Sequence, residues 1–202
     1  MAIQNLLIDL GDVLYAIDLQ KSIDAWQAMV PDGEAVNYAK NDQHGLFSLL
    51  DKGQIEIEDF ASQLRDHYHL QGEIPEIIRA WEALLIGLIP GRLELILQLK
   101  EKGYQLALLS NTNEHHFHCY VDECRDLFNQ LDYLFLSFEM GMRKPDAEIY
   151  ETALQEAGWK ASETLFFDDS LSNIEGAKAI GLQTAHIRRR EDFITHTEDL
   201  LR

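Results

Sequence analysis

The sequence predicts an α/β protein with a parallel sheet, helices on both faces of that sheet, and a helical bundle inserted after the first strand. From Pro90 onward, short apolar segments alternate with helix-like segments, an order that is typical of parallel βαβ units. The apolar run Leu6–Ile8 near the N-terminus needs the same sheet to become buried. Between these regions, residues 17–86 show helical spacing and no β-type alternation.

The bulk composition limits the classes of partner. The chain has 202 residues, a formal net charge of −18 and two cysteines. So acidic a surface repels nucleic acid and anionic membranes, and no apolar run approaches the ~18 residues of a membrane span. Two cysteines are too few for a disulfide framework, and the N-terminus lacks the features of a signal peptide. We therefore expect a cytoplasmic protein with neither nucleic acid nor membrane as its partner.

The individual elements follow from apolar spacing and from glycine or proline stops. The first strand, Leu6–Ile8, leads into Asp9. The inserted region carries helix-like segments at residues 18–30, 46–50, 56–70 and 74–85. After it, strands are expected at 104–109, 133–136, 164–167 and 183–187, and helices at 92–102, 146–157, 173–180 and 192–201. This order predicts an α/β core of residues 1–16 and 87–202 and a helical domain of residues 17–86.

Polar side chains follow several predicted strands at the point where each strand ends. They are Asp9, Ser110 with Asn111, and Asp168 with Asp169. Lys144 belongs to a fourth group, Gly141–Pro145, which follows the strand that begins at Tyr133 and precedes the next helix. The carboxyl ends of parallel strands meet at one edge of a sheet, where open α/β folds bind ligands. We therefore expect these side chains to converge in space.

The expected cluster suits phosphoryl chemistry. Neighbouring carboxylates repel one another unless a cation neutralises them, and Mg²⁺ typically takes one or two carboxylates together with water and substrate phosphate. A lysine and a serine hydroxyl beside that ion would donate to the phosphoryl oxygens. Asp9 would then serve both as a metal ligand and as a nucleophile that forms an aspartyl-phosphate.

Four segments resemble, in order, the four motifs of the haloacid dehalogenase (HAD) superfamily. They are Asp9–Leu14, Leu109–Thr112, Arg143–Pro145, and Phe167–Asp169 with Asn173. The resemblance covers the whole chain and implies a Rossmann-like core with a C1-type helical cap. It is strongest to bacterial α-D-glucose-1-phosphate phosphatases and weaker to the N-terminal phosphatase domain of soluble epoxide hydrolases.

The resemblance implies a role for each matching residue. Asp9 matches the nucleophile and a Mg²⁺ ligand. Ser110, with the neighbouring Asn111, matches the group that hydrogen-bonds the phosphoryl oxygens. Lys144 matches the lysine that balances the negative charge of nucleophile and phosphate.

The metal-binding positions include two departures from the family pattern. Asp169 matches the acidic Mg²⁺ ligand, and Asp168 would support the metal shell or orient Lys144. Gly11 stands where most phosphatases of the family carry an aspartate that acts as general acid and base; its carbonyl can still reach Mg²⁺, but it cannot carry a proton. Asp12 either reaches the site through a water or points away. Asn173 replaces a further aspartate.

We therefore predict a Mg²⁺-dependent phosphatase of small phosphorylated metabolites, with a sugar phosphate as the candidate substrate and a monomer or weak dimer as the assembly. One alternative is a metal-independent haloacid dehalogenase, against which Asp169 argues. The other is a catalytically inactive ligand-binding protein, which Gly11 favours.

Several other residues receive a specific expectation. The spacing of the histidines and cysteines does not match common zinc motifs, so a solvated helix face is expected for His115, His116, His118, Cys119 and Cys124. Gln43 and His44 are candidates for reading the substrate. The core of the helical bundle is expected to contain Trp26, Phe47, Phe60 and Trp81.

Overall fold

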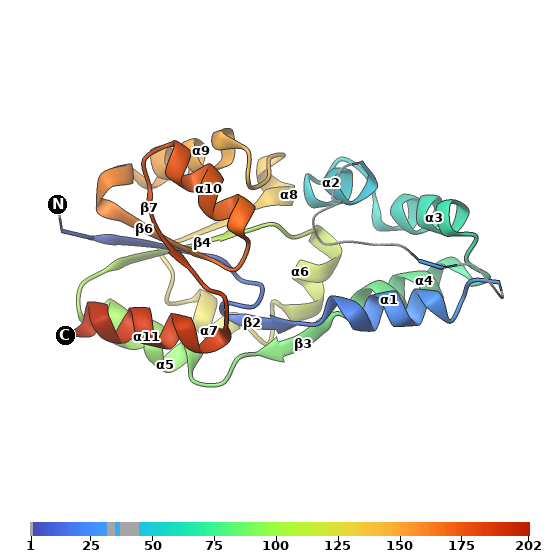
Figure 1. The fold of residues 1–202 in the computed structure, drawn as a ribbon, viewed down its shortest axis with the longest axis horizontal. Helices are drawn as coiled ribbons and strands as arrows, with labels where there is room; N and C mark the ends of the chain where they lie inside the picture. Colours follow the sequence, from blue (N-terminus) through green and yellow to red (C-terminus); the bar gives the residue numbers. More distant parts are fainter. Residues whose placement is uncertain (1, 32–34, 37–44) are drawn as a thin grey trace.

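The computed structural model describes residues 2–31, 35–36 and 45–202 and has a parallel five-stranded sheet at its centre (Figure 1). The strand order is β5-β4-β1-β6-β7, and every neighbouring pair is parallel. The strands are β1 (Asn5–Ile8), β4 (Gln105–Ser110), β5 (Tyr133–Leu136), β6 (Thr164–Asp168) and β7 (Gln183–His186). The four later strands lie within one residue of their predicted bounds. The predicted fold class is confirmed.

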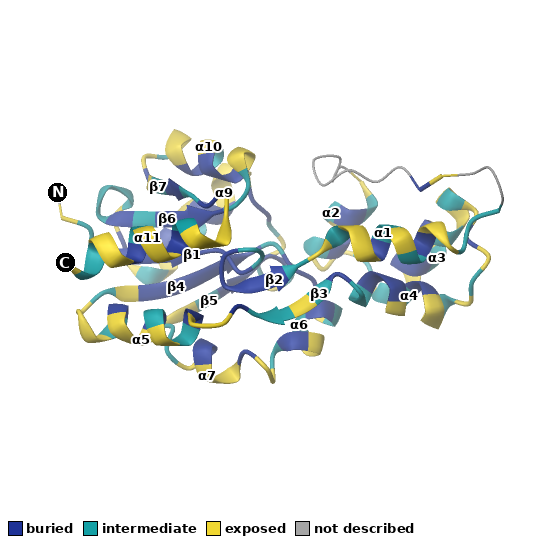
Figure 2. Ribbon diagram, turned by 60° about the horizontal axis from the view of Figure 1, so that its bottom comes forward, coloured by how far each residue is buried: buried dark blue, intermediate teal, exposed yellow. Residues whose placement is uncertain are grey.

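Helices cover both faces of the sheet, which is why the central strands read as continuous apolar runs. Leu6 and Ile8 of β1 pack on one side, and Leu7 packs on the other. The first side is covered by α5 (Arg92–Glu101), α7 (Arg125–Phe128) and α11 (Arg190–Leu201); the second is covered by α9 (Ala147–Ala157) and α10 (Leu171–Ala179). Figure 2 shows the buried strands between helices whose outer faces are exposed.

The inserted helices form a lobe of their own beside the sheet (Figures 1 and 2). We call this lobe the cap; its helices are α1 (Leu19–Gln27), α2 (Leu46–Asp51), α3 (Ile57–Tyr68) and α4 (Ile74–Glu82). Its core contains the four predicted aromatic residues, and the rings of Trp26 and Trp81 stack with their centroids 5.4 Å apart. Gln43 and His44 lie outside the described residues. The bounds of the two domains stay a prediction.

The connection between cap and core differs from the expectation. The fourth helix of the insertion ends at Glu82 rather than at Leu85, and the chain then forms β3 (Leu85–Leu88). This strand pairs antiparallel with β2 (Tyr15–Ile17), which leads into the cap. The prediction that no strand interrupts residues 17–86 is therefore wrong, because local helical spacing carries no information about a pairing partner about 70 residues away.

Three short helices were also not anticipated in the core. They are α6 (Glu114–Tyr120), α7 and α8 (Ser137–Met140), and a 3₁₀ turn (Ala161–Glu163) precedes β6. Among the described residues, no helix combines the length and apolar character needed to cross a membrane.

Candidate active site

The predicted site residues converge at the carboxyl-terminal edge of the sheet. Asp9 follows β1, Ser110 ends β4, and Asp169 follows β6. They face a cavity of about 430 Å³ between the sheet and the cap. The core residues that line it include Asp9, Gly11, Ser110, Asn111, Lys144 and Asp169. Parallel strands separated widely in sequence thus place their terminal side chains in one cavity.

Lys144 lies at the centre of the polar network. Its side chain is 1% exposed, and its Nζ donates to Asp9 Oδ1 at 2.6 Å, to the Leu109 carbonyl at 2.7 Å and to Asp168 Oδ2 at 2.7 Å. The backbone of Lys144 is held by Asn111, whose Oδ1 accepts from its N–H and whose Nδ2 donates to its carbonyl, both at 2.9 Å. The ammonium is therefore fixed in direction, and the side-chain amide of Asn111 is committed to positioning it.

Asp168 is fully buried and does not line the cavity. Besides Lys144, its carboxylate accepts from the backbone N–H of Ser170 at 2.8 Å and from Asn173 Nδ2 at 3.0 and 3.1 Å. With its oxygens so occupied, Asp168 orients Lys144 in this structure. Asn173 supports the same contact.

The electrostatics of the cluster fit a hard divalent cation. One oxygen from each of Asp9, Asp168 and Asp169 lies within 4.8 Å of the others. Burial raises the pKa of Asp9; Lys144 lowers it, while the charges of Asp168 and Asp169 raise it further. Burial disfavours the charge of Lys144, but Asp168 and Asp9 outweigh that effect and raise its pKa. Three carboxylates facing one lysine leave a local excess of negative charge, and an oxygen-only donor set is what Mg²⁺ prefers.

The structure also defines the surroundings of Gly11, the position that lacks a proton-carrying side chain, and of its neighbour Asp12. A Cβ atom at Gly11 would lie 3.3 Å from Ile17 Cδ1 and 4.0 Å from Asp9 Oδ2. Asp12 has a positive φ of 56°, and its Oδ1 accepts from Arg190 Nη2 at 2.8 Å and from the backbone N–H of Ile17 at 3.4 Å. The carboxylate of Asp12 is thus held by Arg190 rather than directed at Asp9.

The cap side of the cavity contains residues that the sequence did not single out as a site. Asp51 of α2 pairs with Arg143 at 3.3 Å across the cap–core boundary. Trp81 and His116 also line the cavity, with ring centroids 4.8 Å apart. Trp81 Nε1 and His116 Nε2 are buried and have no hydrogen-bond partner within the described part of the chain. Such atoms are costly to bury.

The expected solvated helix face is wrong for His116 of α6 and for Cys124, which directly precedes α7, because both are buried. Burial lowers the pKa of His116 to about 3, so this histidine is neutral. His118 is exposed as expected. One signal was present in the sequence: His116 and Tyr120 lie four residues apart and share a helix face, and both are buried here.

Fold and site together define a Rossmann-like α/β protein with an aspartate directly after its first strand. The family model for haloacid dehalogenase-like hydrolases matches residues 3–181. The chain belongs to this family and is a HAD-type phosphatase.

Three relatives illustrate the similarity. D-ribitol-5-phosphate phosphatase of Bacteroides thetaiotaomicron is 32% identical over 187 residues, which cover 90% of each chain. A sesquiterpene phosphatase of Aspergillus oryzae is 29% identical and covers 90% of this chain and 88% of its own. The crystal structure of a HAD family enzyme from B. thetaiotaomicron, in complex with magnesium and inorganic phosphate, is 32% identical with a TM-score of 0.76 and covers 92% of this chain and 94% of that one. A particular similarity to glucose-1-phosphate phosphatases stays a prediction.

Proposed function

We propose that the enzyme hydrolyses small hydroxylated phosphomonoesters, such as sugar or polyol phosphates, through an aspartyl-phosphate and with Mg²⁺. The observation that carries this proposal is the 2.6 Å contact between Lys144 Nζ and Asp9 Oδ1 at the edge of the cavity. It fixes one oxygen of a buried carboxylate and leaves the second oxygen, Oδ2, on the side of Gly11.

Asp9, Asp169 and the backbone carbonyl of Gly11 would hold Mg²⁺. When bound, the ion neutralises negative charge on the phosphoryl oxygens and on the carboxylates. The fit rests on the crowded carboxylates of this chain, and a relative that is 32% identical binds magnesium and phosphate.

The residues of the chain account for the two chemical steps. Asp9 Oδ2 attacks phosphorus, the ester P–O bond breaks, and the leaving oxygen takes a proton from water because Gly11 offers none. A water then attacks phosphorus, which restores the carboxylate and releases inorganic phosphate. Ser110, 3% exposed at the end of β4, donates a hydrogen bond to the phosphoryl oxygens in both steps. The ammonium of Lys144, whose three N–H bonds go to Asp9, Leu109 and Asp168, balances negative charge at the site.

The cap side of the cavity favours a leaving group with hydroxyls. Trp81 Nε1 is a donor and neutral His116 Nε2 is a donor or an acceptor; both are buried without a partner in the described part of the structure. A hydroxyl group of the substrate would satisfy each of them.

A second candidate substrate is an apolar phosphate ester. The same cavity is lined by Ile17, Leu19, Leu84 and Leu85, and one relative is named a sesquiterpene phosphatase. A panel of sugar, polyol and terpenyl phosphates, assayed by phosphate release, separates the two candidates. A preference for terpenyl esters would overturn the hydroxylated class.

The mechanism is tested with Asp9→Asn and with a chelator. Asp9→Asn should reduce phosphate release to background. EDTA should abolish the activity of the parent enzyme, and added Mg²⁺ should restore it. Turnover of 2-haloacids that persists in EDTA would support the dehalogenase alternative. A flat response across the whole ester panel would support the binding-protein alternative. Undiminished phosphatase activity of the Asp9→Asn variant would rule out the proposed aspartyl-phosphate intermediate.

A further inference from the structure

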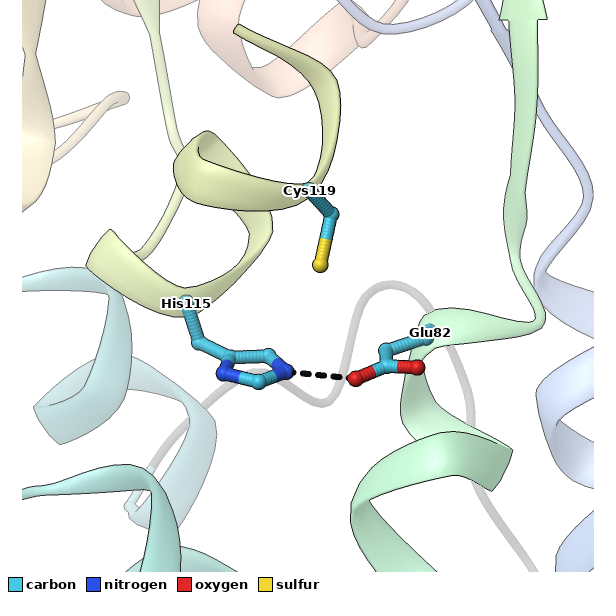
Figure 3. Close-up of side chains that lie close together, drawn as sticks. All are labelled: Glu82, His115 and Cys119. Atoms are coloured by element: carbon cyan, nitrogen blue, oxygen red, sulfur yellow. Dashed lines mark hydrogen bonds and ion pairs between the residues drawn. The ribbon is translucent and has the colours of Figure 1, made fainter.

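A second group of ligand-type side chains lies where the cap meets the core, outside the catalytic cavity. His115 and Cys119 are one helical turn apart on α6, and Glu82 is the last residue of α4 (Figure 3). His115 Nε2 lies 2.7 Å from Glu82 Oε1, and one ligand atom from each of the three residues lies within 4.8 Å of the others. None of the three lines the cavity that contains Asp9.

The chemistry of this group differs from that of the carboxylate cluster. It offers one sulfur, one imidazole nitrogen and one carboxylate oxygen, a mixture that suits Zn²⁺ rather than Mg²⁺. Figure 3 shows the three side chains directed toward one another from two different helices. Three protein ligands of these types leave a fourth tetrahedral position for water.

The spacing of the ligand atoms permits a tetrahedral ion after a small adjustment. Bonds of about 2.0–2.3 Å to zinc place tetrahedral ligand atoms about 3.3–3.7 Å from each other. His115 Nε2 and Glu82 Oε1, now 2.7 Å apart, therefore have to separate by about 0.6 Å. Both side chains are partly exposed, at 28% and 35%, so each of them borders solvent on one side.

We propose that Glu82, His115 and Cys119 form a Zn²⁺ site that joins the cap to the core. Glu82 lies three residues before β3, the strand that leads out of the cap. Helix α6 starts directly after the segment that contains Ser110 and is capped by Asn113, whose Oδ1 accepts from the His116 N–H. A metal at this place fixes the end of the cap helix α4 against a helix that follows the phosphate-binding strand.

The site was not visible in the sequence because its ligands are divided between two segments. His115 and Cys119 have the i, i+4 spacing that places two side chains on one helix face, but two ligands do not make a zinc site. The third, Glu82, lies 33 residues before His115 and on another domain of the predicted organisation. Only the packing of α4 against α6 supplies it.

Zn²⁺ binding is measured by calorimetric titration of the full chain with an excess of Mg²⁺, which occupies the carboxylate cluster, and a phosphine reductant. The parent should bind one equivalent of Zn²⁺ in a saturable manner. Cys119→Ser and His115→Ala should weaken that binding by at least the about 10–100-fold that loss of a supporting residue costs at metal sites. His118→Ala is the matched control, because His118 lies on the same helix and is 68% exposed at its side chain.

Two further measurements make the proposal refutable even if one variant fails to fold. Co²⁺ added to the parent should give a thiolate charge-transfer absorption band that Cys119→Ser lacks; no band in the parent overturns the site. Glu82→Gln should also weaken Zn²⁺ binding at least about 10-fold. Binding of Zn²⁺ by Glu82→Gln with the affinity of the parent would overturn the link between cap and core, and equal affinity in all variants would overturn the site as a whole.

Discussion

Replacing Lys144 by methionine tests whether this lysine holds the site together electrostatically. Its ammonium is almost completely buried and lies 2.6 Å from Asp9 and 2.7 Å from Asp168. Removing one partner of a buried ion pair typically costs about 3–5 kcal/mol, because it leaves uncompensated buried charge. We expect a loss of that size in the free energy of unfolding, measured by urea titration in EDTA at about pH 8.

The loss should depend on pH in a defined direction. Lys144 lowers the pKa of Asp9 against the opposing effect of burial, so Lys144→Met raises the folded-state pKa of Asp9 further above its unfolded value. A carboxyl group whose pKa is raised in the folded state makes the folded protein less stable as pH rises from the unfolded-state pKa to the folded-state pKa. The deficit should therefore be largest at about pH 8 and smaller at about pH 5.

A matched control is available in the pair between Lys100 and Asp132. Its atoms are also 2.6 Å apart, but the side chains are 31% and 33% exposed, so Lys100→Met should cost no more than about 1 kcal/mol. Adding Asp9→Asn to Lys144→Met should recover part of the stability. Equal losses for the two lysine variants, or a loss for Lys144→Met that does not vary with pH, would refute the electrostatic reasoning.

Three further predictions concern single positions. Ser110→Ala should lower kcat by about 10²–10³-fold, the usual loss for one donor to a developing oxyanion; an unchanged steady-state kcat would remove Ser110 from the phosphate site. Burial raises the pKa of Asp51 to about 6 from its ordinary 3.8, against the effect of Arg143, so the parent loses stability as pH rises from about 4 to 6. The Asp51→Asn variant lacks this loss. Its free energy of unfolding, measured with urea, should therefore rise relative to that of the parent by up to about 3 kcal/mol between about pH 4 and 7; a difference between the two proteins that stays constant over this pH range would contradict the prediction. Gly11→Asp should raise kcat by up to about 10²-fold for an alkyl phosphate and less for nitrophenyl phosphate; equal changes for both esters would show that the new carboxyl donates no proton.

The sequence was sufficient to predict the sheet, because its strands could be recognised from local sequence patterns. Leu6–Ile8, Leu106–Leu109, Tyr133–Leu136 and Leu165–Phe167 are apolar runs that stop at polar residues, and parallel topology then brings their ends together. The convergence of Asp9, Ser110 and Asp169 at one cavity follows from this rule. The roles of these residues, the domain bounds, the compartment and the oligomeric state stay predictions.

What the sequence did not reveal depends on contacts between distant segments. The pairing of β2 with β3 joins residues about 70 positions apart, and the Asp51–Arg143 ion pair joins the cap to the loop before Lys144. The burial of His116 depends on the cap residue Trp81. In each case the partner belongs to another element, and no local period or spacing identifies it.

The antiparallel ribbon of β2 and β3 has a mechanical consequence for the cap. The chain enters the cap through one strand and leaves it through the other. The strands pair at Tyr15–Leu88 and Ala16–Gly87 and, after a register shift, at Ile17–Leu85. Two independent tethers would allow the cap to slide and twist as well as to tilt. A paired ribbon resists sliding along its own length, because that would break its register, and it yields most easily by bending out of its plane. Bending of this ribbon is therefore the least costly way for the cap to move relative to the sheet.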